Sequence, residues 1–215
     1  MTLDILPAFV GSLILAVYLT RFFFLKLKAK TPLSLGSELD RRKKRTLVVL
    51  GSGGHTTEML RLLDHMQKEI YNPRYYFLAN TDHMSIKKLK LRSVDPNCIQ
   101  LIPRSREVGQ SYLTSIFSTL LACLSTIPRA LWINPDLLMV NGPGTCLPVC
   151  IAALITNMLT FNRVTIVFVE SICRTETLSL TGKILYRLNI ADMFFVQWER
   201  LKLTYPKCTY VGRVV

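Results

Sequence analysis

The feature that most constrains the fold is a repeated alternation of short, continuously apolar runs with longer segments of helical character, from residue 46 almost to the end of the chain. Continuous apolar runs are typical of strands in a parallel sheet whose two faces are both covered by helices. We therefore expect an α/β domain with a parallel sheet over residues 46–215. The predicted strands are Thr46–Leu50, Tyr75–Ala79, Cys98–Ile102, Leu137–Asn141, Val164–Val169, Met193–Gln197 and a short Thr209–Val211. The predicted helices are Thr57–Glu69, Met84–Leu91, Tyr112–Leu131, Thr145–Leu159 and Leu178–Asn189.

A second apolar feature lies at the N-terminus, where Leu3–Leu25 is almost free of charge. About 20 apolar residues are enough to span a bilayer. The basic residues follow this run from Lys26 onward, whereas a signal peptide carries them in front. The positive-inside rule then places Lys26 and the rest of the chain in the cytosol. We expect a transmembrane anchor over residues 1–25 and a basic linker over residues 26–45; a buried core helix is the alternative.

The net charge of +13 and the six cysteines narrow the choice of partner and compartment. A basic excess beside an apolar segment fits an anionic membrane surface as well as nucleic acid. The sequence has no zinc-finger or RRM signature, so we expect no nucleic-acid partner. The cysteines are scattered without a C-x-x-C pair, which predicts small buried residues in a reducing compartment and no metal site.

One internal segment, Ser111–Pro128, is uncharged and long enough to suggest a second membrane span. A span there would place the loops before and after it on opposite sides of the membrane and would split the predicted sheet. We therefore expect a crossover helix that can also touch the bilayer surface.

The first predicted strand ends in a glycine-rich turn, GSGGH at residues 51–55. Glycines let backbone amides approach a ligand, and the N-terminus of the following helix, capped by Thr56 or Thr57, favours an anion. The turn lacks the third glycine of a dinucleotide fingerprint and the G-K-[ST] of a P-loop. A tight structural connection therefore remains an alternative. The candidate phosphate-binding residues here are Gly51, Ser52, Gly53, Gly54 and Thr56.

Further polar groups follow other predicted strands, and all of these loops should meet at the carboxyl edge of the sheet. The NGPGT segment offers Gly142, Gly144 and Thr145, and two such loops on one edge favour a diphosphate. Arg104 and Arg106 can bind phosphate with fork geometry, or they belong to a solvated loop.

Two side chains are candidates for proton transfer at the same edge. A neutral imidazole at His55 can accept a proton or donate to a phosphate oxygen. Glu170 ends the predicted strand Val164–Val169, where it is either functional or a structural capping group.

Five segments together resemble the membrane-anchored subunit of the eukaryotic dolichyl-diphosphate N-acetylglucosaminyltransferase. They are GSGGHTTE at 51–58, IPRSREVGQS at 102–111, NGPGT at 141–145, FVES at 168–171 and YVGRVV at 210–215. A more distant resemblance is to the N-terminal half of the bacterial lipid II glycosyltransferase, which has two Rossmann-like domains in the GT-B arrangement. The chain of 215 residues has room for only one such domain. The resemblance thus implies a separate soluble subunit that binds the donor sugar nucleotide.

The resemblance implies an inverting transfer of GlcNAc from UDP-GlcNAc to dolichyl-diphosphate-GlcNAc, the second step of lipid-linked oligosaccharide assembly. It implies an endoplasmic reticulum membrane protein, also in the continuous nuclear envelope, with a single span, a lumenal N-terminus and a cytosolic domain. We expect the chain to be inactive alone, to need no cofactor and to contact other early enzymes of that assembly. The alternatives are a non-catalytic membrane scaffold and a self-contained nucleotide-dependent Rossmann enzyme.

Residue roles follow from the same resemblance. His55 is the first candidate for the base that takes the acceptor's proton, and Glu170 is the second. The glycine loops and the two arginines are expected to hold the acceptor diphosphate. The C-terminal segment is expected to pack on the soluble subunit, or it is a plain edge strand; its residues are Tyr210, Val211, Gly212, Val214 and Val215.

Overall fold

The computed structural model describes residues 11–12, 15–16, 19, 42–106, 109–160 and 162–214. The residues described before position 20 are helical. The remainder of the predicted anchor (1–25) and most of the predicted linker (26–45) lie outside the described residues, as does Val215.

The described chain forms one parallel sheet in the order β3-β2-β1-β4-β5-β6-β7. This confirms the predicted α/β class. The strand positions agree with the prediction to within a few residues, and Asn141 and Gln197 lie just beyond their strands. The strands are β1 (Thr46–Leu50), β2 (Arg74–Ala79), β3 (Ile99–Ile102), β4 (Leu137–Val140), β5 (Thr165–Val169), β6 (Met193–Val196) and β7 (Thr209–Tyr210).

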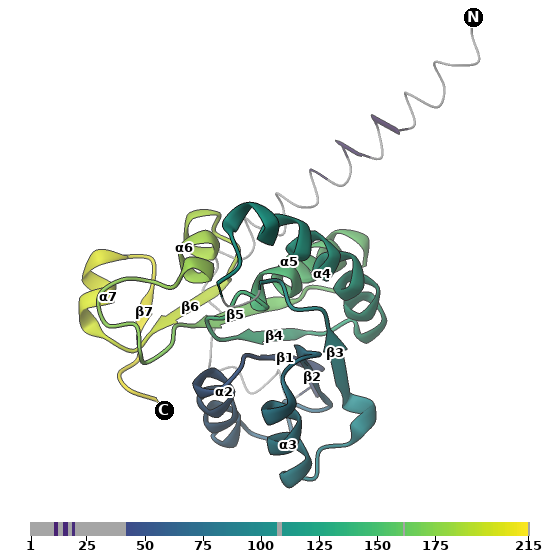
Figure 1. The fold of residues 1–215 in the computed structure, drawn as a ribbon, viewed down its shortest axis with the longest axis horizontal. Coiled ribbons are helices and arrows are strands. Elements are labelled where there is room, and N and C mark those ends of the chain that lie inside the picture. Colours follow the sequence, from purple (N-terminus) through teal and green to yellow (C-terminus); the bar gives the residue numbers. More distant parts are fainter. Residues whose placement is uncertain are drawn as a thin grey trace, which may run out of the picture.

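Helices cover both faces of this sheet, as the continuously buried strands require. Helices α4, α5 and α6 lie on one side, and α2 and α3 on the other (Figure 1). The helices are α2 (Gly54–Asp64), α3 (His83–Leu91), α4 (Tyr112–Ile133), α5 (Cys146–Leu159), α6 (Leu180–Arg187) and α7 (Glu199–Thr204), with a 3₁₀ turn at Pro96–Cys98.

Alternate residues of β1 supply the two halves of the core. Leu47 and Val49 belong to the cluster that includes α5, whereas Val48 and Leu50 belong to the cluster that includes α2. All four side chains are almost completely buried. The first strand is therefore central, and the loop that follows it is held from both faces.

The predicted start of the helix after β1 was wrong. Helix α2 begins at Gly54 with Gly53 as its N-cap at φ 63°, so neither threonine caps it. The Thr56 hydroxyl bonds back to the Gly51 carbonyl, and the Thr57 hydroxyl lies 3.4 Å from the Gly53 carbonyl. A glycine takes this left-handed cap geometry without the strain that a side chain would bring. The helix also ends at Asp64, five residues before the predicted end.

Helix α4 is the crossover from β3 to β4, and it packs on α5. Its inner face carries Ala122, Thr126 and Ala130, which are fully buried. Within the part of the chain that the structure describes, Leu113–Ile133 is the one helix long and apolar enough to cross a membrane. The sheet is continuous on both sides of α4, as expected for a crossover helix. The outer face is apolar and exposed, through Leu113, Ile116, Phe117, Leu120, Leu121 and Leu124.

The prediction that the six cysteines are buried holds for four positions, holds only in part for the half-buried Cys98 and fails at one. Cys123, Cys146, Cys150 and Cys208 are buried, and burial raises the pKa of the Cys146 thiol to about 12. Thiols with raised pKa values are poor nucleophiles. Cys173 is exposed, because it lies in the loop that follows β5.

Candidate functional site

The candidate site is a cleft of about 390 Å³ at the carboxyl edge of the sheet. Strands β1 and β4 are neighbours, and the chain runs from β1 to β2 on one side and from β4 to β5 on the other, so the strand order reverses between them. Ligands of open α/β sheets bind in the crevice that this reversal creates. The segments after five successive strands line the cleft. Its polar lining residues include Ser52, His55, Asp82, Arg104, Arg106, Thr145, Arg174, Ser179 and Thr181.

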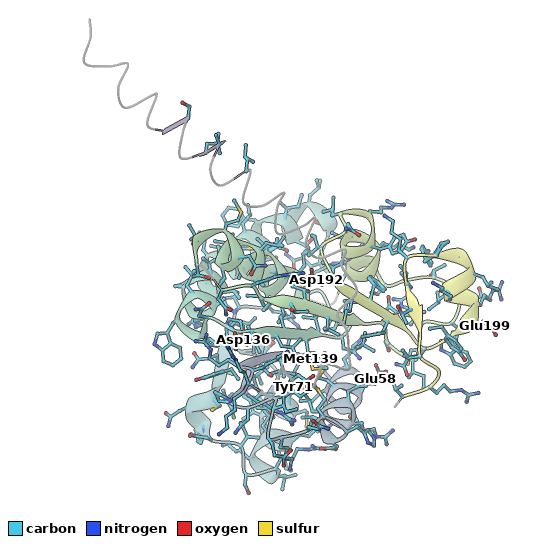
Figure 2. The ribbon with its side chains drawn as sticks, turned by 180° about the vertical axis from the view of Figure 1, so that it is seen from behind. Glu58, Tyr71, Asp136, Met139, Asp192 and Glu199 are labelled. Carbon is cyan, nitrogen blue, oxygen red and sulfur yellow. The ribbon has the colours of Figure 1, made fainter. Side chains whose placement is uncertain are left out.

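His55 lies in the first turn of α2 and is linked to the loops after β4 and β5 by a chain of hydrogen bonds. Its Nδ1 lies 2.7 Å from the Oδ1 of Asn141. The Nδ2 of Asn141 donates to the Oε2 of Glu58 at 2.9 Å, and the hydroxyl of Ser171 donates to Oε1 at 2.9 Å. Figure 2 labels Glu58 on α2, Met139 within β4 and Asp136 just before that strand begins. The network therefore ties three separate segments together behind the cleft.

Two glycines allow this close approach. Gly142 has φ 70°, and a Cβ there would lie 2.9 Å from the Cε1 of His55. A Cβ on Gly51 would overlap the ring of Pro143. The glycines at these positions thus bring the two loops and the imidazole into contact, which gives each of them a steric role.

Three arginines bring positive charge to the cleft. Arg104 donates to the hydroxyl of Ser52 at 3.3 Å, which joins the loops after β1 and β3. Arg106 donates through Nε and Nη2 to the carbonyl of Gln110, at 3.1 and 2.9 Å. Arg174 is exposed on the loop after β5. Fork-shaped guanidinium groups around one concave surface suit a phosphate or diphosphate.

One further hydroxyl lies next to this surface. The Oγ of Ser105 is buried and, among the described residues, is the one buried side-chain polar atom without a hydrogen-bond partner. It would lie 3.3 Å from a Cβ on Gly144, at the loop that opens α5. A buried polar group without a partner is destabilising, so this hydroxyl suits a ligand oxygen or water.

Several predicted site residues do line the cleft, and others do not. Those that line it are Ser52, His55, Arg104, Arg106, Gly142, Gly144 and Thr145. Gly51 is buried, and Gly53 and Gly54 are exposed beside the cleft. Thr56 is fully buried and bonds to Gly51 and Ser85, so its hydroxyl is used inside the protein.

Glu170 lies behind the cleft wall and is completely buried. Its carboxylate accepts from the backbone of Ser171 at 3.1 Å, and from the backbone and hydroxyl of Ser179 at 2.8 and 3.1 Å. Desolvation raises the pKa of this carboxyl group, and those hydrogen bonds oppose the shift. This geometry favours a structural role for Glu170 and leaves His55 as the candidate base.

The C-terminal segment forms the edge of the sheet. Tyr210 and Val211 are largely exposed, and Gly212 has φ 73°. The backbone N–H of Val214 donates to Gln197, whose side-chain amide donates to the carbonyl of Glu170. The exposed edge is therefore tied through one buried side chain to the strand end behind the cleft.

Residues of this site that were not predicted from the sequence include Glu58, Asn141, Ser171 and Arg174. Glu58 and Ser171 appear in the motifs that carry the resemblance, yet their pairing joins positions 113 residues apart. Asn141 was expected to end a strand, and Arg174 lies in a loop without a motif. For Glu58 and Asn141, the one signal in the sequence was a polar residue next to an apolar run.

The match to a family model decides the identity. The model described as "Oligosaccharide biosynthesis protein Alg14 like" matches residues 46–214. This chain belongs to the Alg14-like family.

Relatives of this Alg14-like chain are named UDP-N-acetylglucosamine transferase subunit ALG14. The mouse protein is 48% identical over 187 residues, which covers 81% of this chain and 85% of the mouse protein. The human protein is 48% identical over 180 residues, which covers 79% of this chain and 82% of the human protein. The protein of Schizosaccharomyces pombe is 39% identical over 179 residues, covering 80% and 84%.

Two solved structures with the same fold are longer chains, and the likeness covers less than half of each. MurG of Acinetobacter baumannii superposes with a TM-score of 0.57 and 16% identity, covering 78% of this chain but 45% of MurG. A UDP-N-acetylglucosamine 2-epimerase superposes with a TM-score of 0.56 and 19% identity, covering 77% of this chain and 45% of the epimerase chain. The likeness shows that this domain has the fold of one part of those larger proteins.

Proposed function

We propose that this Alg14-like chain is the acceptor-binding subunit of a UDP-N-acetylglucosamine transferase. The observation that carries the proposal is the cleft at the point where the strand order of the sheet reverses. The hydrogen-bonded imidazole of His55 and three arginines line this one cleft. The printed name of the mouse and human relatives supports a transferase subunit. The acceptor is dolichyl-diphosphate-GlcNAc, and a soluble partner subunit binds UDP-GlcNAc.

The acceptor diphosphate binds to the arginine-lined part of the cleft. Arg104, Arg106 and Arg174 neutralise its charge, and the N-terminus of α5 beside Gly144 and Ser105 adds backbone and hydroxyl donors. These groups fix the sugar at the end of the diphosphate without taking part in bond making. Positioning of this kind lowers the entropic barrier to transfer.

His55 takes the proton from the acceptor hydroxyl as that oxygen attacks the donor sugar. An inverting transfer needs one such base and a leaving nucleotide on the opposite face of the sugar. The partner subunit supplies the donor-binding face, so neither chain has a complete site.

The outer face of α4 rests on the bilayer that holds the acceptor's lipid. It exposes six large apolar side chains, and the helix starts at the loop that carries Arg106. A membrane contact there keeps the cleft close to the headgroups. The N-terminal anchor fixes the chain in the endoplasmic reticulum membrane with its domain in the cytosol.

Two substitutions test this assignment in the assembled complex. His55→Ala should lower kcat about 10²- to 10⁴-fold, the range lost with a general base, while KM for the acceptor stays similar. Arg104→Ala should raise the acceptor KM with a smaller effect on kcat. His65→Ala, which removes an exposed imidazole at the far end of α2, is the control. Full activity of His55→Ala would contradict the base role.

A further inference from the structure

Each hydrogen bond behind the cleft has a defined donor and acceptor, and the first donor in the chain is the backbone N–H of Cys173. That group lies 3.3 Å from the Oγ of Ser171 and donates to it. The hydroxyl proton of Ser171 is then free to donate to Glu58, at 2.9 Å. A carboxylate can only accept, so the atom of Asn141 that faces Glu58 must be its NH₂ group.

This orientation decides which atom of Asn141 faces His55. With Nδ2 turned toward Glu58, the Oδ1 of Asn141 faces the imidazole, and Oδ1 is an acceptor only. The Nδ1 of His55 must therefore carry the proton and donate it at 2.7 Å. In a neutral imidazole the other nitrogen, Nε2, is then unprotonated. Among the described residues, no hydrogen bond reaches that nitrogen.

We propose that Asn141 and Glu58 are positioning residues that hold His55 in the tautomer with an unprotonated Nε2, ready to accept a proton. Asn141 and Glu58 are almost completely buried, and neither lines the cleft, so they act through the imidazole rather than on the substrate. The other tautomer would place a proton on Nε2 and block its use as a base. The catalytic consequence rests on the function proposed above, whereas the tautomer itself does not.

The measurement is made on the assembled complex, with the full chain labelled with ¹⁵N-histidine and the partner unlabelled. The chain has 3 histidines, so few imidazole signals appear, and His55→Gln identifies those of His55. Long-range ¹H–¹⁵N correlation spectra distinguish a protonated from an unprotonated ring nitrogen. We expect His55 to show protonated Nδ1 and unprotonated Nε2.

A matched pair of variants tests the role of Glu58. Glu58→Leu removes the acceptor and allows the side-chain amide of Asn141 to flip. His55 should then populate both neutral tautomers. The substitution should lower kcat at least about tenfold with acceptor KM retained, since a wrongly held tautomer can reduce kcat about 10⁴-fold. Glu58→Gln still offers an acceptor to Asn141 and should retain the tautomer and most of the activity.

A protonated Nε2 in the unmodified complex would overturn the inference, and so would an unchanged tautomer in Glu58→Leu. The spectrum of the unmodified complex tests the tautomer of His55 even if Glu58→Leu does not fold. Full activity of His55→Gln would instead overturn the proposed base role, and the spectra would still decide the tautomer.

Discussion

At the scale of single residues, Glu170 shows how a buried charge organises the cleft. It accepts three hydrogen bonds from the two ends of the loop between β5 and α6, and Gly182 leaves the space that its carboxylate fills. That loop carries Ser171 and Arg174 to the site. Glu170 therefore acts on the site through backbone geometry.

We predict that Glu170→Gln lowers the free energy of unfolding by about 1–3 kcal/mol, because an amide offers one acceptor oxygen where the carboxylate offers two. Thermal or denaturant unfolding of the complex measures this. The pKa of Glu170 is raised above its usual 4.5 in the folded state. As pH rises through 4.5 the unfolded chain releases this proton first, so its contribution to stability falls with rising pH until the folded group also ionises. Glu170→Gln should remove that slope, and an unchanged slope would contradict the account.

Single residues of the site were only partly predictable from the sequence. His55, Arg104 and Arg106 could be found because each follows an apolar run beside glycine or proline. Asn141 and Glu58 could not be paired, because their contact joins positions 83 residues apart and depends on the strand order. Thr56 was assigned to the ligand, but its hydroxyl is used by its own turn.

At the scale of elements, α4 combines two surfaces of different character. Its inner face packs small side chains on α5, and its outer face exposes large apolar ones. Exposed apolar patches of this kind mark interaction sites in soluble domains. The same composition explains why sequence alone left both a span and a crossover open.

We predict that Phe117→Glu with Leu120→Glu raises KM for an acceptor embedded in liposomes by at least about tenfold, since even one buried apolar side chain contributes about 1.5–3 kcal/mol. KM for a short-chain, water-soluble acceptor should stay unchanged. Leu91→Glu, which alters a residue 77% exposed on α3 across the sheet, is the control. Equal changes in both KM values would contradict a membrane contact.

The C-terminal edge strand leads to a second prediction at this scale. Removing residues 210–215, or introducing Tyr210→Asp, should weaken binding of the soluble partner more than tenfold. Both changes alter the exposed edge that β7 presents. Leu203→Ala on the neighbouring α7 is the control, because that side chain is also exposed to solvent. Co-purification of the partner with the shortened chain would exclude this interface.

The elements themselves were largely predictable, because buried parallel strands are continuous apolar runs. The errors occur where local chemistry overrides that pattern. Helix α2 starts three residues earlier than predicted because Gly53 caps it through its backbone. The short helix α7 was missed, since Glu199–Thr204 is too brief for a periodic signal.

At the scale of the whole molecule, the cleft lies at the carboxyl edge of the single sheet. The fold of the chain covers 45% of MurG, so the likeness is to one part of that larger protein. A donor-binding subunit placed over that edge would complete the site. The charge of +13 and the apolar face of α4 would hold the assembly on an anionic membrane.

The most direct test is GlcNAc transfer to a dolichyl-diphosphate-GlcNAc analogue, measured with this chain alone, the soluble partner alone and the two together. A site shared between subunits predicts transfer only in the mixture, with loss of that activity when the chain carries His55→Ala. Full activity of the partner alone would contradict this account and would reduce the chain to a membrane scaffold.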